Sequence, residues 1–93
     1  MAIGFEIVYH TTVVQDDIPH ITPAWRDRIR DAIEDKLVTS PELFGKPLRR
    51  SLKGYRKLRV GNYRIVFRIQ HTKVIILAIL HRSVVYKESE RRV

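Results

Sequence analysis

Apolar positions follow two different periods along the chain, and the period changes near its middle. In the first half, apolar residues recur three or four positions apart, with charged residues between them. This spacing predicts an amphipathic helix after Thr22-Pro23, where threonine can cap the free amides and proline suits the first helical position. The apolar positions of this helix are Trp25, Ile29, Ala32, Ile33 and Leu37.

The second half alternates between apolar and polar residues, which is typical of β-strands. Gly61-Asn62 is a turn signal between two such strands, and Gln70-His71-Thr72 is another. The last strand is a near-continuous apolar run, typical of a strand buried on both faces. Together with the β-branched and aromatic segment FEIVYH, the pattern predicts four strands, at residues 5–10, 55–60, 63–69 and 74–80.

The remaining segments are expected to be short or irregular. Val13 to Ile21 permits at most a short helix, because it holds two adjacent aspartates and a proline. Ser40-Pro41 repeats the cap signal and starts at most one further turn, which ends near Gly45. The segment from residue 81 to residue 93 leaves the sheet and is expected to form a short terminal helix.

The order of these elements predicts an α+β fold, in which the N-terminal helices pack on one face of a mainly antiparallel four-stranded sheet. A chain of 93 residues is expected to form a single domain over residues 1–93. The absence of cysteine excludes disulfides, thiolate zinc sites and a cysteine nucleophile. Because the chain has no long apolar run and no signal-peptide pattern, we expect a soluble cytoplasmic protein without a membrane partner.

Charge is distributed unevenly around the formal net value of +8. The segment from Lys46 to Lys87 holds twelve Lys and Arg residues and no acid, whereas the residues before it hold eight acids and four bases. A field of one sign over half of a small domain attracts a polyanion, so nucleic acid is the favoured partner. The plainer interpretation is an ordinary solvated face.

Strand alternation determines which of these bases can act together. Leu58 and Val60 should face the helices, and the apolar residues of the following strand should do the same. The intervening basic residues then share the opposite, open face of the sheet. The expected cluster is Lys57, Arg59, Arg64 and Arg68, with Arg56 near its edge and with His81, Arg82 and Tyr86 entering from the end of the last strand.

This set of residues suits chemistry on a phosphate chain. Arg pairs with phosphate oxygens and can stabilise the charge that develops during strand cleavage. A tyrosine hydroxyl or an imidazole can move protons, and RNA supplies its own 2′-hydroxyl as nucleophile. The basic segment offers no pair of carboxylates, so we expect neither a metal site nor a cofactor. The plainer interpretations are that Arg68 only solvates the sheet, and that Tyr55 and Tyr63 only pack.

The runs GKPLRRSLKGYRKLRVGNYRIVFRI and VIILAILHRSVVYKESERR together resemble the RelE toxin family of bacterial and archaeal toxin–antitoxin modules. The resemblance covers roughly Gly45 to Arg92, and it depends on the pairing of the Asn-Tyr-Arg segment with a C-terminal histidine, arginine, x, x, x, tyrosine segment. It implies a small RelE-like toxin that enters the ribosome and cleaves messenger RNA. It also implies inhibition by a small, partly disordered, RelB-like antitoxin, which alone would contact operator DNA.

The resemblance also implies roles for individual residues. By motif, the catalytic arginines fall on Arg64 and Arg82, and the catalytic tyrosine falls on Tyr86. The family also has a pair of basic residues on its second strand, which corresponds to residues 55–60 here. Lys57 and Arg59 match this pair because they are expected on the open face of the sheet, whereas Arg56 matches it by its distance from the preceding tyrosine. Either Tyr86 or His81 transfers the proton. The residues expected to bind RNA without catalysing its cleavage are Arg56, Arg68, His81 and Lys53.

Two alternatives belong to other functional classes. ParE toxins share this fold but poison DNA gyrase, and their chains generally lack the ending with arginine and tyrosine that this chain keeps. A basic module that binds RNA or a protein without catalysis is the third class, because a fold does not by itself imply an activity.

Overall fold

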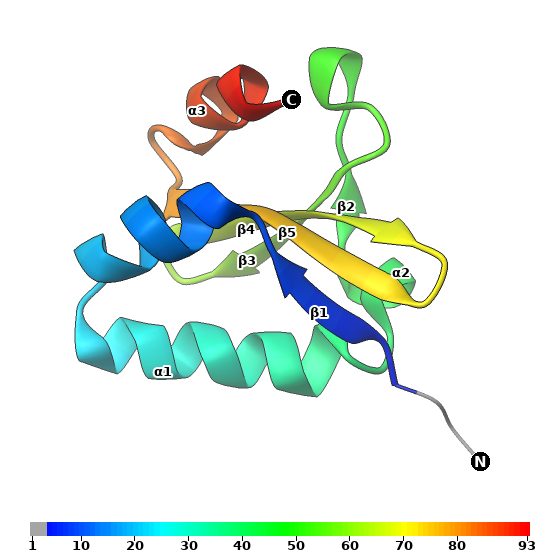
Figure 1. Ribbon diagram of the computed structural model, residues 1–93, viewed down its shortest axis with the longest axis horizontal. Helices are drawn as coiled ribbons and strands as arrows, with labels where there is room; N and C mark the ends of the chain where they lie inside the picture. Colours follow the sequence, from blue (N-terminus) through cyan, green and yellow to red (C-terminus); the bar gives the residue numbers. More distant parts are fainter. Residues whose placement is uncertain (1–3) are drawn as a thin grey trace.

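The computed structural model describes residues 4–93, which build one five-stranded sheet with the strand order β1-β5-β4-β3-β2 (Figure 1). β1 runs parallel to β5, and the other neighbouring strands are antiparallel. The strands are β1 (Glu6–Tyr9), β2 (Lys46–Pro47), β3 (Arg56–Val60), β4 (Tyr63–Gln70) and β5 (Lys73–His81). The prediction of an α+β fold with a mainly antiparallel sheet is confirmed.

The number of strands differs from the prediction by one. β2 has only two residues, and it pairs with β3 through Lys46 opposite Lys57 and Pro47 opposite Arg56. Two residues are too few to show an alternating pattern, and proline is found mainly at the edges of sheets. The sequence therefore indicated a connecting segment where the structure adds an edge strand.

The long helix begins at the predicted position. α1 (Pro23–Ala32) continues without a break into the wider helical turn η3 (Ile33–Leu37) and covers one face of the sheet (Figure 1). The Thr22 carbonyl accepts a hydrogen bond from the Arg26 amide at 2.9 Å. Within residues 4–93, however, the Thr22 side chain makes no capping bond, so this detail of the prediction is wrong.

The segment before α1 is more helical than expected. It forms η1 (Val13–Asp17) and η2 (Ile18–His20), and Val13 is fully buried against the sheet. Proline fits here because it lies at the start of the tight turn η2, where its missing amide costs little. The short turn α2 (Pro41–Phe44) is found as predicted.

The two faces of the sheet are covered by different helices. The face toward α1 holds the larger apolar cluster, in which side chains of the strands pack against the N-terminal helices. The other face is covered in part by the C-terminal helix α3 (Val85–Arg92), which packs mainly on β5 (Figure 1). A smaller cluster lies beneath α3 and contains Val66, Leu77, Ala78 and Val85.

A β-bulge divides β5. Val66 lies opposite Ala78, whereas the next residue of β4, Phe67, lies opposite Ile76, so Leu77 is an extra residue on β5. A bulge of this kind bends its strand and increases the local twist. It lets Leu77 and Ala78 both join the cluster beneath α3.

The turn between β3 and β4 is held by an aromatic side chain from α1. Gly61 has a φ of +58°, and a Cβ atom at this position would lie 2.3 Å from the Trp25 ring. Glycine is therefore required both by the backbone conformation and by the close approach of the ring. No helix within residues 4–93 has the length and apolar character needed to cross a membrane.

Candidate nucleic-acid interface

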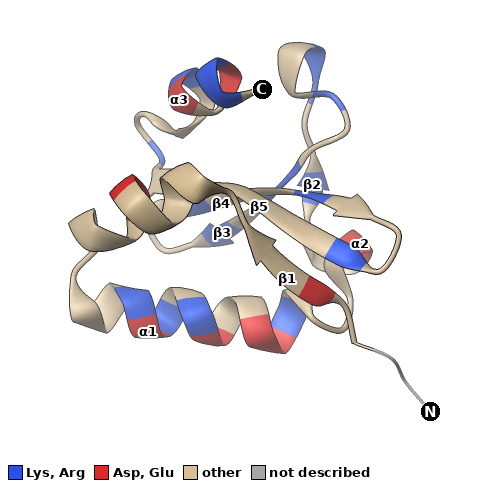
Figure 2. Ribbon diagram, in the orientation of Figure 1, with Lys and Arg blue, Asp and Glu red and all other residues tan. Residues whose placement is uncertain are grey.

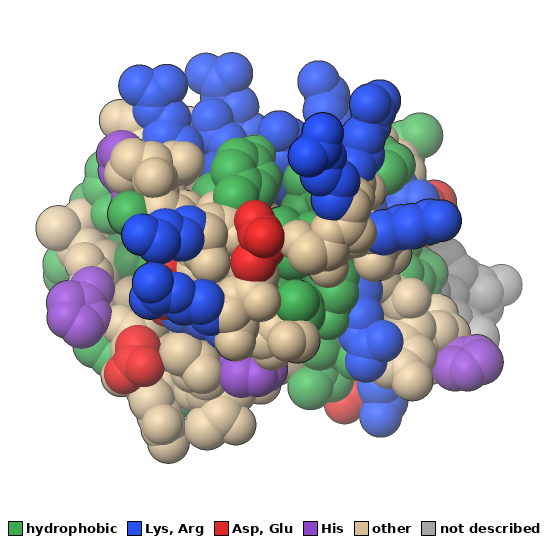
Figure 3. Space-filling model, turned by 90° about the horizontal axis from the view of Figure 1, so that it is seen from above, with side chains coloured by type: hydrophobic (Ala, Val, Ile, Leu, Met, Phe, Trp, Pro, Cys, Tyr) green, Lys and Arg blue, Asp and Glu red, His purple; other side chains and the backbone are tan. Residues whose placement is uncertain are grey.

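The charge segregation in the sequence becomes a segregation in space. Acidic residues lie on α1, η1, η3, β1, α2 and α3, and α1 also carries arginines, whereas β3, β4 and the loop between β2 and β3 carry Lys and Arg without an acid (Figure 2). Figure 3 views the face that carries α3, and basic side chains crowd its upper margin. A surface of this kind presents a positive potential to a polyanion.

Lys57 and Tyr86 contact each other on this face. The Lys57 Nζ donates a hydrogen bond to the Tyr86 Oη at 2.9 Å, and it lies 5.3 Å from the centroid of the tyrosine ring. β3 supplies the lysine and α3 supplies the tyrosine, so the contact joins residues 29 positions apart. Both side chains are half-buried, which limits their motion while leaving one side accessible.

Arg64 lies on the same face, directly opposite Arg59 across the β3–β4 pair. The Arg64 Nη1 donates to the carbonyl of Gly61 at 3.0 Å and to the carbonyl of Tyr63 at 2.9 Å. These bonds fold the side chain back over the turn and fix the plane of its guanidinium. The other guanidinium nitrogens remain available for a phosphate. Lys57, Arg59 and Arg64, together with Tyr86, are called the basic cluster below.

The functional candidates at the end of β5 and just after it lie apart from one another. Arg82 is exposed at the end of the sheet, where its amide donates to the Asn62 carbonyl at 2.8 Å. His81 instead lies beside Tyr63, with a ring separation of 6.2 Å, and its Nδ1 lies 2.8 Å from the Ser83 hydroxyl. Because Tyr63 belongs to the face toward α1, the structure brings Tyr86, and not His81, to Lys57.

Three further residues expected to bind RNA lie at different distances from the basic cluster. Arg56 is directed to the opposite face, where its Nη1 donates to the carbonyls of Gly45 at 2.9 Å and Glu42 at 3.3 Å. The expectation that Arg56 borders the cluster is wrong, because strand alternation places it beside Phe67 rather than beside Lys57.

Arg68 lies on the expected face of the sheet, and Lys53 lies in the loop before β3. Arg68 shares the face of Arg64, but four residues along a strand place it about 13 Å away. Lys53 is exposed just after the turn η4 (Arg50–Leu52), which lies beside α3. Both residues are therefore at the margins of the basic cluster rather than within it.

Comparison with known proteins places the chain in a family. Residues 5–86 match the family described as the ParE toxin of type II toxin–antitoxin system, parDE. Toxin RelG of Mycobacterium tuberculosis is 35% identical over 82 residues, which cover 86% of this chain and 94% of RelG. The chain belongs to the RelE/ParE toxin superfamily.

Solved structures agree with the fold of the toxin. It matches a chain of the toxin–antitoxin complex RelBE2 from Mycobacterium tuberculosis with a TM-score of 0.79 and 32% identity, over 89% of the toxin and 97% of that chain. It also matches a chain of the RelB–RelE antitoxin–toxin complex from Methanococcus jannaschii, with a TM-score of 0.67 and 28% identity, over 87% and 96%. The predicted RelE-like fold is confirmed.

One buried ion pair of the toxin was not predicted. Arg92 of α3 reaches Asp17 at the end of η1, and their side chains are only 9% and 1% exposed. Hydrogen bonding to Asp17 raises the pKa of the Arg92 guanidinium above its ordinary value and outweighs the opposing effect of burial, so the side chain stays charged. The two residues are 75 positions apart, and no local pattern in the sequence connects them.

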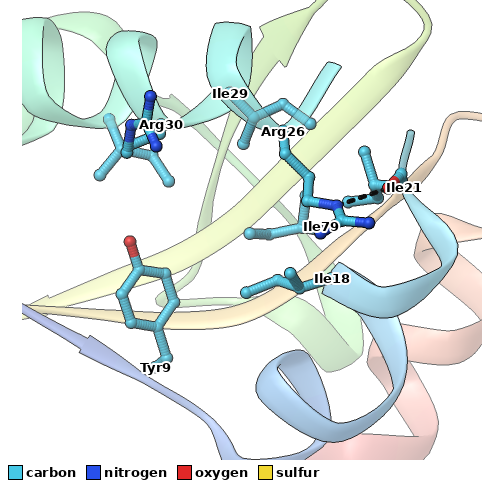
Figure 4. A pocket seen from close by; sticks show the side chains of 8 residues that line it. Tyr9, Ile18, Ile21, Arg26, Ile29, Arg30 and Ile79 are labelled. Carbon is cyan, nitrogen blue, oxygen red and sulfur yellow. Dashed lines mark hydrogen bonds between the residues drawn. The ribbon is translucent and has the colours of Figure 1, made fainter. Parts of the chain in front are cut away.

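An apolar hollow of 280 Å³ lies on the other side of the toxin, between α1, η2 and β5 (Figure 4). Its walls are mainly isoleucine side chains, and its polar groups come from Tyr9, Arg26 and Arg30. The Arg26 Nε already donates to the Ile21 carbonyl at 2.7 Å. This hollow is mainly apolar, whereas the basic cluster places several cations on one face of the sheet, so the candidate site for nucleic acid remains on the face that carries α3.

Proposed function

We propose that the toxin is a ribosome-dependent endoribonuclease that cleaves messenger RNA through attack by the RNA's own 2′-hydroxyl. The observation that carries this proposal is the 2.9 Å hydrogen bond from Lys57 to the Tyr86 hydroxyl on the sheet face that also carries Arg59 and Arg64. Cations beside a group able to transfer a proton are what phosphodiester cleavage requires. The similarity to toxin RelG and to the toxin chains of RelB–RelE complexes supports the same activity.

The cluster suggests how the charges would act. The 2′-hydroxyl would release its proton to solvent, and its oxygen would form a bond to the adjacent phosphorus while the bond to the 5′-oxygen breaks, which leaves a cyclic phosphate and a new 5′-hydroxyl. Lys57 and Arg64 would stabilise the negative charge that develops on the phosphoryl oxygens. Arg82, exposed at the end of β5, would add a third cation once RNA is bound.

Tyr86 is the preferred group for proton transfer. Its oxygen accepts a hydrogen bond from Lys57, so its own proton is directed away from the lysine and is free for another acceptor. That acceptor would be the departing 5′-oxygen, which needs one proton to leave as a hydroxyl. His81 is engaged with Ser83 on the other side of β5 and has no part in this proposal.

Expression of the toxin in cells, followed by mapping of transcript 5′ ends, tests the proposal. We expect new ends within translated regions, and their loss when ribosomes are removed from an in vitro reaction. The matched control is the Arg64→Ala variant at equal protein level. Unchanged transcripts in cells that express the wild-type toxin would contradict the assignment.

Gyrase poisoning is the second candidate, and one observation favours it. The family that matches residues 5–86 is that of the ParE toxin, and a shared fold can carry more than one activity. A supercoiling assay with purified gyrase separates the two functions. Inhibited supercoiling together with intact transcripts would assign the toxin to the ParE-like activity, and RNA binding with neither effect would make it a non-catalytic module.

We further propose that a small, RelB-like antitoxin holds the toxin inactive in the cytoplasm. Support comes from the two solved relatives, both of which are toxin–antitoxin complexes. An acidic, partly disordered partner would neutralise the basic cluster and fold on binding. Operator DNA would be contacted by the antitoxin alone. Purification from the native host at low salt should recover the toxin with a small acidic protein, and recovery of the toxin by itself would contradict this.

A further inference from the structure

The ion pair between Asp17 and Arg92 joins the C-terminal helix to the first helical segment. The Arg92 Nη1 lies 2.7 Å from the Asp17 Oδ2, and the Nη2 lies 2.8 Å from the Oδ1. Two parallel hydrogen bonds of this kind fix the direction of the guanidinium as well as its distance. Both side chains are almost completely shielded from water, so salt screens the pair little.

The same two side chains also hold the irregular part of β5. The Asp17 Oδ2 accepts a further hydrogen bond from the Ile79 amide at 2.9 Å, and the Arg92 Nη1 donates to the Leu77 carbonyl at 3.0 Å. Leu77 is the extra residue of the bulge and lies outside the β4–β5 register. Three segments that are distant in the sequence, η1, β5 and α3, therefore meet at this pair.

The position of α3 determines where Tyr86 lies. Val85, Ser89 and Arg92 fall on one side of the helix, and each is buried or nearly so against the rest of the protein. Tyr86 is one position further around the helix, and its hydroxyl meets Lys57. Tyr86 and Arg92 are six residues apart, which is about 9 Å along the helix axis. A shift or rotation of α3 would therefore carry the hydroxyl away from the lysine.

α3 depends on tertiary contacts for its place. It has only eight residues, and a helix of that length is marginal in water without packing partners. Ser89 is fully buried, and its hydroxyl has no hydrogen-bond partner in the part of the chain that the structure describes. Ser89 therefore allows α3 to pack closely against the rest of the protein but adds no directional hydrogen bond. Arg92 thus supplies a directional anchor from α3 to the sheet that is separate from the bond between Tyr86 and Lys57.

We propose that Asp17 and Arg92 form a clasp that fixes α3 on the sheet and positions Tyr86 at Lys57 for RNA cleavage. The clasp follows from the contacts alone, whereas its effect on cleavage rests on the proposed function. A buried ion pair contributes little net stability compared with apolar residues of similar volume, because desolvation offsets the attraction. Its paired hydrogen bonds do favour one orientation of α3. A fixed orientation of this helix keeps the Tyr86 hydroxyl at Lys57.

Arg92→Lys and Asp17→Asn test the clasp with small changes. Lysine keeps the charge and most of the stem but cannot form the paired bonds, and asparagine keeps the shape of aspartate without its charge. The matched control is Arg91→Lys, because Arg91 is the neighbouring arginine and pairs with Glu88 at the exposed surface. Circular dichroism and thermal unfolding identify the temperature range in which all variants are folded.

Two measurements then separate the clasp from its catalytic consequence. Amide hydrogen exchange over residues 85–92 should become about tenfold faster or more in Arg92→Lys and Asp17→Asn, and should stay unchanged in Arg91→Lys. In ribosome-dependent cleavage, kcat should fall about tenfold while KM changes little, because binding cations remain in place. Faster exchange with unchanged kcat would overturn the positioning role, and unchanged exchange would overturn the clasp.

A double substitution shows whether the effect passes through Tyr86. In a Tyr86→Phe background, Arg92→Lys should cause little further loss in kcat, because the hydroxyl that it positions is already absent. Additive losses would show that the effect of Arg92 does not pass through Tyr86, which would overturn the positioning role. If the wild-type toxin does not cleave RNA, the proposed function fails by itself. The nuclear Overhauser contact between the Tyr86 ring and the Lys57 side chain then decides positioning, since it should weaken in Arg92→Lys.

Discussion

The two faces of the sheet differ although the same strands build both. Toward α1, side chains such as Ile65 and Phe67 are fully buried in the larger apolar cluster. Toward α3, the alternate positions of β3 and β4 hold Lys57 and Arg64, and the apolar cluster beneath the helix is small. Successive residues on one strand, such as Ile65 and Arg64, therefore alternate between packing in the apolar core and carrying positive charge on the open face. Packing on one face stabilises the fold, which allows the other face to hold mutually repelling charges.

Phe67→Ala should give the largest effect, on the face toward α1. The side chain is 0% exposed, so its truncation removes apolar contacts and leaves a cavity, at a cost of about 3–5 kcal/mol in the free energy of unfolding. Chemical denaturation measures this loss. The control is Val66→Ala, one residue away on the other face, with an expected cost of about 2 kcal/mol. Equal costs at the two positions would contradict the division between the faces.

Arg64→Ala should give the next largest effect, on activity rather than on stability. Removal of a cation that acts mainly in the transition state should lower kcat for RNA cleavage by about 100- to 1,000-fold. Arg30→Ala is the matched control, because Arg30 lies on α1 and forms an exposed pair with Asp27. A similar loss of activity in both variants would show that total charge, and not the basic cluster, determines cleavage.

Tyr86→Phe distinguishes proton transfer from packing within the basic cluster. If the hydroxyl transfers a proton, kcat should fall about 100-fold, with RNA binding intact and a loss of only about 1 kcal/mol in stability from the missing Lys57 bond. If the ring stacks on a base, Phe should retain activity while Tyr86→Ala weakens RNA binding by about 1–3 kcal/mol. Loss of stability in both variants would make Tyr86 a structural residue.

Tyr9→Phe should have the smallest effect, and only in alkaline solution. Burial, and then the charge of Glu34, raise the pKa of the Tyr9 phenol above its ordinary value of 10.0. The folded toxin therefore keeps this proton at a pH where the unfolded chain has lost it. The associated stability is fully present below about pH 10 and is lost as the pH rises toward the folded pKa. Unfolding titrations should show a shallower alkaline decline in Tyr9→Phe than in the wild-type toxin.

Part of the candidate site follows from local pattern alone. The alternation in β3 and β4 correctly placed Lys57, Arg59 and Arg64 on one face, because successive side chains of a strand point to opposite sides. The same rule, applied to Arg56, would have assigned it to the opposite face. The sequence resemblance favoured distance from the preceding tyrosine instead, and the structure agrees with strand alternation.

Other parts of the site depend on how distant segments meet. His81 ends β5, and the residues after it carry no periodic signal that shows which way they turn, so the sequence left both His81 and Tyr86 as candidate proton carriers. The docking of α3 against β5 brings Tyr86 to Lys57, and the pairing of His81 with Tyr63 across the strands directs the imidazole elsewhere. Both outcomes depend on the path of the chain after the sheet ends.

By itself, the sequence determined most of the elements, the α+β class and the separation of charge along the chain, because these follow from backbone periods and from the order of residues. Only the tertiary structure decided that Arg92 meets Asp17, that β2 adds a fifth strand, and that a bulge at Leu77 adjusts β5 beneath α3. The physical reason is the range of the interactions. A backbone period is set by adjacent residues, whereas a contact across 75 positions depends on every segment that folds between its partners.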